Sequence, residues 1–156
     1  MGIQKMTSSG LQWLWQTGMY YYENIKKIVD AGSAQSVSVH GFINRMDYAF
    51  AAADIIVSRA GAGTISELCL VGKPVILIPS PNVAEDHQTR NAEALSRNDA
   101  AILIPDNQAE EILVDEAIRL ALDASEKALL SRNIRKMADR DADIKIANEI
   151  LKLARI

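Results

Sequence analysis

The segment with the clearest chemical potential is residues 58–67, Ser-Arg-Ala-Gly-Ala-Gly-Thr-Ile-Ser-Glu. It follows an apolar stretch and precedes a helical pattern, and Gly61 and Gly63 would let a ligand approach the backbone closely. The free N–H groups of a first helical turn carry the positive end of the helix dipole, which favours a phosphate. The segment therefore predicts a phosphate site, although a tight turn into a helix explains the same residues. It departs from the dinucleotide fingerprint, because Ser66 stands where the third glycine should be.

Two roles are open for Glu67. Thr64-Ile65-Ser66-Glu67 matches a capping box, in which the glutamate would reach back to the N-cap amide of a helix over 64–71. A carboxylate one turn into a helix that holds a diphosphate would also reach the hydroxyls of a ribose. Both interpretations place Glu67 at the start of the same helix.

A second polar loop covers residues 79–91 and includes Asp86, which is predicted to cap a helix over 86–97. Gln88 and Asn91 lie three residues apart and so share one face of that helix. The pair could hydrogen-bond a sugar, or it could be an ordinary solvated first turn. His87 could act in catalysis, but a surface or capping role is the simpler interpretation of this residue.

Composition excludes several other functions. The 156 residues carry 17 basic and 20 acidic groups, a balance that argues against a nucleic-acid partner. A single cysteine, Cys69, and two histidines are too few for a disulfide framework or a convincing metal site. Neither a nucleophile elbow nor a Gly-Lys phosphate loop is present, and no cofactor is expected. With no signal peptide or membrane-spanning run in the sequence, we expect a soluble cytoplasmic domain.

Short apolar strands alternate with amphipathic helices along the chain. This order predicts an α/β domain of the Rossmann-like three-layer α/β/α class, with a parallel sheet. Ligands of such sheets bind beyond the carboxyl ends of the strands, which points to the loops at 42–43, 59–64 and 80–88. The predicted strands are 11–16, 37–42, 54–58, 75–78 and 101–104, and the predicted helices are 21–30, 44–53, 64–71 and 86–97, followed by C-terminal helices within 108–154. Asn44 is predicted to cap the second of these helices, and Trp13 and Trp15 are predicted to belong to the core. The tyrosine run at 20–22 is predicted to pack rather than to form a stacking platform.

Several of these motifs together resemble one enzyme family. Residues 53–67, Gly72-Lys73-Pro74, Pro79-Ser80-Pro81 and residues 86–92 are similar to the MurG family of N-acetylglucosaminyltransferases, and residues 14–18 and 41–43 fit the same family. The resemblance covers essentially the whole chain. It implies a GT-B glycosyltransferase that converts lipid I to lipid II in peptidoglycan synthesis. Residues 1–156 would then be its C-terminal domain, which binds UDP-N-acetylglucosamine (UDP-GlcNAc).

The resemblance also implies a role for individual residues. The uracil would lie against the backbone of Ile43, with Phe42 beside it, and Glu67 would accept from the ribose hydroxyls. Gln88 corresponds to the family's sugar-contacting glutamine, and Asn91 lies near it. The remaining candidate contacts are the residues of the glycine-containing loop: Arg59, Gly61, Ala62, Gly63, Thr64, Ile65 and Ser66.

The family's donor domain begins with a strand and a Gly-Gly-Ser-type loop, and neither is found in residues 1–9. We therefore expect the chain to be a piece of a longer enzyme whose other domain carries the catalytic base and the surface for lipid I. That enzyme is expected to be peripheral on the cytoplasmic face of the inner membrane. The absent strand would lie between strands 11–16 and 54–58, so the sheet should close up, borrow a segment, or pair between chains.

Three alternatives remain at this stage. The chain could be the donor-binding subunit of a two-chain N-acetylglucosaminyltransferase, or part of another GT-B sugar-nucleotide enzyme. It could also be a non-catalytic nucleotide-binding subunit that works only with a partner chain.

Overall fold

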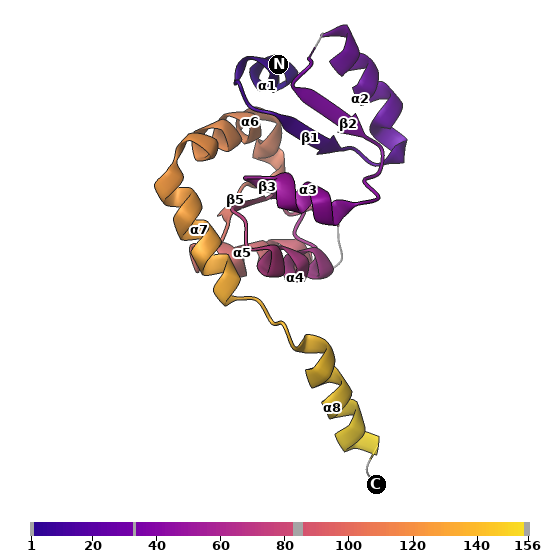
Figure 1. Cartoon of the computed structure of the whole chain (residues 1–156), viewed down its shortest axis with the longest axis vertical. Helices are drawn as coiled ribbons and strands as arrows, with labels where there is room; N and C mark the ends of the chain where they lie inside the picture. The colour runs from indigo at the N-terminus through magenta and orange to yellow at the C-terminus, as the bar shows by residue number, and fades with distance from the viewer. Residues whose placement is uncertain (1, 33, 83–85, 155–156) are drawn as a thin grey trace.

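A computed structural model describes residues 2–32, 34–82 and 86–154. Strands and helices alternate through most of this part of the chain, and three helices follow the last strand (Figure 1). The strands are β1 (Trp13–Gln16), β2 (Val37–His40), β3 (Ile56–Ser58), β4 (Val75–Leu77) and β5 (Ile102–Leu103). The helices are α1 (Gly2–Ser8), α2 (Met19–Ala31), α3 (Met46–Ala52), α4 (Ala62–Val71), α5 (His87–Ser96), α6 (Asp106–Leu122), α7 (Ala124–Lys136) and α8 (Ala142–Ala154).

The described strands form two parallel sheets. In the first, β1 pairs with β2, with Trp13 opposite Val37. In the second, the order is β3-β4-β5, with Ile56 opposite Val75 and Ile76 opposite Ile102. Every strand pair among the described residues is parallel, as the βα alternation predicts. Within the described residues β1 and β3 do not pair, so the division falls where the sequence led us to expect an absent strand.

The centre of the larger sheet is β4, which is buried on both faces. Val75 and Leu77 belong to one core cluster, whereas Ile76 and Ile78 belong to another. Successive side chains of a strand point to opposite faces, so this alternation places an apolar layer on each side of the sheet. Val75, Ile76 and Leu77 are fully buried, as expected for a central parallel strand.

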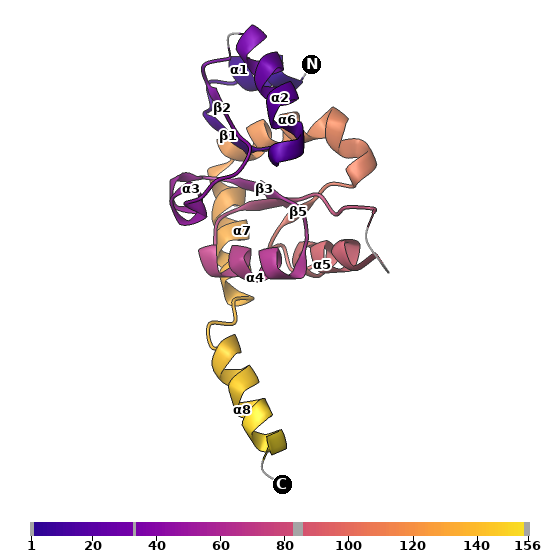
Figure 2. The same ribbon diagram turned by 90° about the vertical axis from the view of Figure 1, so that its right-hand side faces the viewer.

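Helices cover both faces of the β3-β4-β5 sheet, and this confirms the three-layer class. On one face Leu68 of α4 and Leu95 of α5 join the cluster around Val75. On the other face Ala117 and Leu120 of α6 join the cluster around Ile76. Figure 2 shows α4 and α5 together on one side of these strands. Helix α7 contributes Leu130 to one cluster and Ile134 to the other, so it packs against the apolar layers of both faces.

The smaller sheet has its own core. Met6 of α1, Val29 of α2 and Val37 of β2 are buried together. Trp13 packs against this cluster and also against the α6 cluster of the larger sheet, so its indole connects the two. The indole N–H donates to the carbonyl of Met6 at 3.1 Å. The predicted core role of Trp13 is therefore confirmed.

The C-terminal helix α8 projects away from the rest of the molecule (Figures 1 and 2). It has no buried residue, and Ile144, Ile150 and Leu151 are each more than half exposed. Among the described residues, no helix combines the length and the apolar character needed to cross a lipid bilayer.

Three local predictions need correction. The N-cap of α3 is Arg45 rather than Asn44, and its side chain makes no capping hydrogen bond. The third strand begins at Ile56 rather than Asp54, and Val57 is 40% exposed because β3 is an edge strand. The tyrosine run at the start of α2 was predicted to pack, but Tyr20 is 87% exposed and its described ring contact is with Tyr21.

Candidate functional site

The turn between β3 and α4 presents unpaired amide groups at the carboxyl end of a parallel strand. Helix α4 begins at Ala62 with Gly61 as its N-cap, and the first intrahelical bond runs from the Ile65 N–H to the Gly61 carbonyl at 2.8 Å. The N–H groups of Ala62, Gly63 and Thr64 have no acceptor among the described residues, as expected for a first turn. A Cβ added to Gly63 would meet nothing within 4 Å. The turn therefore offers three donors, the positive end of a helix and room for an anion.

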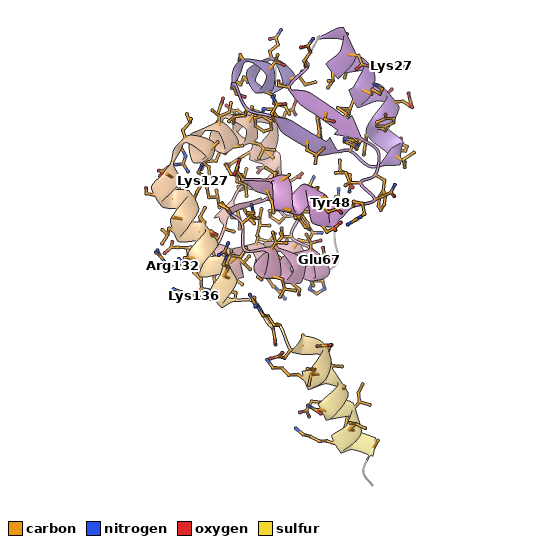
Figure 3. The ribbon with its side chains drawn as sticks, viewed as in Figure 1. Lys27, Tyr48, Glu67, Lys127, Arg132 and Lys136 are labelled. Carbon is orange, nitrogen blue, oxygen red and sulfur yellow. The ribbon has the colours of Figure 1, made fainter. Side chains whose placement is uncertain are left out.

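The predicted capping box is wrong. Because the helix starts at Ala62, Thr64 is already its third residue and cannot be the N-cap. Glu67 is exposed, and its carboxylate makes no hydrogen bond or ion pair to another described residue. Figure 3 places Glu67 on α4, apart from the labelled basic side chains of α7, Lys127, Arg132 and Lys136. Of the two roles considered for Glu67, contact with a ligand is the one that this geometry leaves open.

The side chains of Ile65 and Ser66 both make contacts within the protein. The Ile65 side chain packs against the core cluster, and the Ser66 hydroxyl donates back to the Ala62 carbonyl at 3.2 Å. Both line a cavity of about 170 Å³ between α4, α5 and the segment after α7. Burial raises the pKa of the Cys69 thiol in the same cavity, which keeps it protonated and weakly reactive.

The Arg59 side chain connects three segments of the chain. Its guanidinium donates to the carbonyl of Ile78 at 3.3 Å and to the carboxylate of Asp106 in the first turn of α6. This links the end of β3 to the end of β4 and the start of α6, a role that we did not predict from the sequence. A cleft of about 410 Å³ lies beside Asp106, the partner of Arg59. It is lined by Pro79, Pro81, Asp86, Thr89, Glu93, Leu103, Pro105, Asp106 and Asn107.

Gln88 and Asn91 both point into the β3–α4 turn. The Oε1 atom of Gln88 accepts from the N–H of Ala60 at 3.2 Å and from the N–H of Ser80 at 2.9 Å. The Nδ2 atom of Asn91 donates to the carbonyl of Ala60 at 3.0 Å. The prediction that the two side chains share one helical face is confirmed. Through these three bonds, that face contacts the protein backbone.

Asp86 is the N-cap residue of α5, as predicted, although its side chain makes no capping hydrogen bond within the described part of the chain. Instead its Oδ1 accepts from the Thr89 hydroxyl at 2.6 Å, and its backbone is left-handed with φ 54°. Residues 83–85 of the predicted polar loop lie outside the described residues.

The loop after β2 presents Phe42, which is 66% exposed, and Ile43. The Ile43 N–H donates to the Oε1 atom of Gln16 at the end of β1, at 2.8 Å. We did not predict Gln16 as a site residue from the sequence. Its place at the end of a predicted parallel strand could have indicated one, because ligands of such sheets bind beyond the carboxyl ends of the strands.

Comparison with known proteins agrees with this arrangement. The model of the glycosyltransferase family 28 C-terminal domain matches residues 3–147. A protein of Parabacteroides distasonis is 50% identical over 151 residues, covering 97% of this chain and 41% of that protein. One from Porphyromonas gingivalis strain W83 is 52% identical, with 97% and 40% covered. Both are named UDP-N-acetylglucosamine–N-acetylmuramyl-(pentapeptide) pyrophosphoryl-undecaprenol N-acetylglucosamine transferase.

Solved structures give the same result. The crystal structure of Acinetobacter baumannii MurG superposes with a TM-score of 0.84 at 25% identity, covering 97% of this chain and 44% of that one. A kitacinnamycin glycotransferase superposes with a TM-score of 0.60 at 24% identity, which shows a common fold. The chain spans about two fifths of the length of the curated relatives named above. With the family model matching nearly its full length, the chain belongs to the family of glycosyltransferase family 28 C-terminal domains.

Proposed function

We propose that this chain is the donor-binding part of an N-acetylglucosaminyltransferase and holds UDP-GlcNAc for transfer to lipid I. The observation that carries the proposal is the open first turn of α4, with unpaired N–H groups at Ala62, Gly63 and Thr64. The names of the 50–52% identical relatives specify the same donor and an undecaprenol-linked acceptor.

Each part of the donor has a chemically suitable partner. The diphosphate would lie at the start of α4, where the helix dipole favours negative charge. The ribose hydroxyls would donate to Glu67, whose carboxylate has no hydrogen-bond partner among the described residues. The uracil would bind the backbone of Ile43 beside the exposed Phe42. Gln88 has its Oε1 atom engaged, so its Nε2 group remains to donate to the sugar.

Transfer would need a second domain. A base must deprotonate the acceptor hydroxyl, and positioning of the two substrates supplies roughly 7–11 kcal/mol of such a barrier. We expect the 156-residue chain to bind UDP near the millimolar range, where about 4 kcal/mol of binding free energy is enough. We expect it to transfer no sugar until an acceptor domain is joined to it. The acceptor would be lipid I, held by that domain at the cytoplasmic face of the inner membrane.

Amide NMR titration tests the donor choice. UDP and UDP-GlcNAc should shift the amide signals of Ile43 and of residues 62–67, because the proposed site lies there. GDP-mannose serves as the control, since a guanine carries a bulkier ring with a different hydrogen-bonding edge. An equal response to both nucleotides would contradict a pyrimidine site.

An activity assay tests whether transfer needs a second domain. Labelled GlcNAc transfer from UDP-GlcNAc to a lipid I analogue should be absent with the chain alone. It should appear when the chain is joined to the N-terminal part of a relative. Robust turnover by the isolated chain would place the catalytic machinery within these 156 residues and overturn the proposal.

A further inference from the structure

The described residues form two lobes that share few contacts. The N-terminal lobe comprises residues 2–32 and 34–44, and the C-terminal lobe comprises residues 45–82 and 86–154. Each lobe has its own sheet and its own core, and no described strand of one lobe pairs with a strand of the other. Figure 1 shows α1, α2, β1 and β2 of the N-terminal lobe grouped at one end of the molecule.

The polar contact between the lobes is one ion pair. The Nζ atom of Lys5 in α1 lies 2.5 Å from a carboxylate oxygen of Asp115 in α6. Within the ranges that the structure describes, no other hydrogen bond or ion pair joins the two lobes. Both side chains are about half exposed, and an ion pair that solvent screens in this way stabilises a fold little.

The remaining link is apolar and centred on Trp13. Its ring packs against core clusters of both lobes, and Val114 of α6 packs against the cluster of the N-terminal lobe. Leu14 of β1 and Val57 of β3 are 51% and 40% exposed, so the other lobe does not cover them. Relative motion is the ordinary behaviour of parts of a chain that share so small an interface.

The proposed donor would contact both lobes at once. Phe42 and Ile43, where the uracil is proposed to bind, belong to the N-terminal lobe. The unpaired N–H groups of residues 62–64 and the carboxylate of Glu67, which are proposed for the diphosphate and the ribose, belong to the C-terminal lobe. A nucleotide can therefore fill both places only when the lobes stand at the separation that its own length sets.

We infer that a uridine diphosphate nucleotide holds the two lobes of this chain in one relative position, whereas the ligand-free lobes move about the contact at Trp13. The inference rests on the proposed function. A ligand shifts an ensemble toward the arrangement that it binds best, and only a ligand with contacts on both lobes distinguishes their arrangements. Uridine alone or pyrophosphate alone contacts one lobe and leaves the motion unchanged.

Distance distributions between two spin labels test this inference. Lys27→Cys in α2 and Arg132→Cys in α7, both labelled in Figure 3, place one label on each lobe in a Cys69→Ala background. Diluting the labelled chain with unlabelled chain restricts the measurement to distances within one chain. The distribution should be broad without ligand and narrow with saturating UDP. A mixture of uridine and inorganic pyrophosphate should leave it broad, because the covalent link between the two groups is missing.

Matched controls come from the same chain. Glu110→Cys with Arg132→Cys places both labels on the C-terminal lobe and should give a narrow distribution with and without UDP. Asp115→Asn breaks the ion pair between the lobes, so it should broaden the ligand-free distribution and leave the UDP-bound one narrow. Asp30→Asn breaks the ion pair with Lys26 inside the N-terminal lobe and should change neither distribution.

The outcomes separate this inference from the proposed function. A narrow distribution in the ligand-free chain would overturn the inference, and so would a broad one that persists where NMR titration shows UDP bound. Narrowing by uridine alone would also overturn it, since uridine should contact one lobe. If UDP causes no NMR shifts, the donor proposal fails. The mobility of the lobes is then judged from the ligand-free chain, where a broad distribution supports it and a narrow one contradicts it.

Discussion

The backbone N–H of Ile43 donates to the side-chain Oε1 of Gln16, at 2.8 Å. This bond joins the ends of β1 and β2 on the side where a uracil is proposed to bind. The pairing edge of uracil carries one N–H donor between two carbonyl acceptors, so it is complementary to a residue that offers both its N–H and its C=O. In the present structure the N–H of Ile43 is occupied, and Gln16 must release it before a uracil can use both groups.

Gln16→Ala should therefore strengthen uridine nucleotide binding. The substitution frees the Ile43 N–H and removes the cost of breaking its bond to Gln16, a neutral hydrogen bond worth about 0.5–1.5 kcal/mol. We expect about a two- to tenfold gain in UDP affinity by NMR titration. Gln12→Ala, in the exposed segment before β1, is the control and should have no effect. Weaker binding by Gln16→Ala would show that Gln16 supports the site.

Glu67→Gln separates ligand contact from helix capping. Because Glu67 is not part of a capping box, the free energy of unfolding should not change measurably. UDP affinity should fall by about 10- to 150-fold, since a hydrogen bond to a charged group is worth about 1.5–3 kcal/mol. Titration with 2′,3′-dideoxy-UDP provides the control, because a ligand without ribose hydroxyls should bind wild type and variant alike. Unchanged UDP affinity would remove Glu67 from the site.

Two glycines should respond in opposite ways to substitution by alanine. At Gly63 a methyl group meets open space, so the fold should tolerate it, and a helical alanine gains about 0.5–1 kcal/mol over glycine. The same methyl should hinder phosphate approach and lower UDP affinity. At Gly72, φ is +67° and a Cβ would overlap the Cγ of Arg135.

Gly72→Ala should accordingly destabilise the fold by about 1–2 kcal/mol, the cost of a left-handed conformation for a residue with a Cβ. UDP affinity should be unchanged after correction for the unfolded fraction. Urea denaturation and NMR titration of both variants measure the two effects. If Gly63→Ala binds UDP as tightly as the wild type, the first turn of α4 is not the phosphate site.

The predictable part of the fold is the part encoded by short, repeating patterns. The run at Val75 to Ile78 was identified as a strand because it is apolar, about as long as a strand, and ended by Pro79. The position of the candidate ligand loops follows from the parallel βα order alone. The capping box at Thr64 failed because spacing identifies a pattern of residues but not the residue at which the helix starts.

The partners of polar side chains were not predictable from the sequence. Gln88 and Asn91 were expected to face either a sugar or solvent, and their bonds to Ala60 join residues about 30 positions apart. Arg59 pairs with Asp106 across an even longer separation. Such contacts depend on how α5 and α6 pack on the sheet, which no local pattern specifies. The exposure of Tyr20 has the same cause, because a helical pattern does not reveal what covers the helix.

Self-association through the sheet is a further expectation. Strands β1 and β3 each have a free edge among the described residues, and such edges recruit other strands. Light scattering at rising concentration should give a mass above that of one chain. Val57→Lys, at a 40% exposed position of β3, should return the chain to a monomer, whereas Val57→Thr should not. A wild-type monomer at every concentration would contradict this expectation.

The last prediction concerns the ion-pair network that joins α6 to α7. Arg119 donates to both carboxylate oxygens of Glu116, at 2.9 and 2.7 Å, and to Glu126 of α7 at 2.6 Å. These bonds hold the pKa of Glu116 below its usual range. A lowered folded-state pKa stabilises the fold above the unfolded value of about 4.3. That contribution is lost as the pH falls through the lower, folded-state value.

Glu116→Gln should therefore cost about 0.5–1 kcal/mol at pH 7, a small effect because Arg119 is 47% exposed and solvent screens the pair. The difference between variant and wild type should shrink as the pH drops below about 4, where the wild-type carboxylate also becomes neutral. Urea denaturation at a series of pH values measures this difference in the free energy of unfolding. Glu110 lies on the same helix and forms no ion pair with another described residue, so Glu110→Gln should show neither effect. A cost that persists undiminished at pH 3 would mean that packing, and not the charge of Glu116, holds the two helices together.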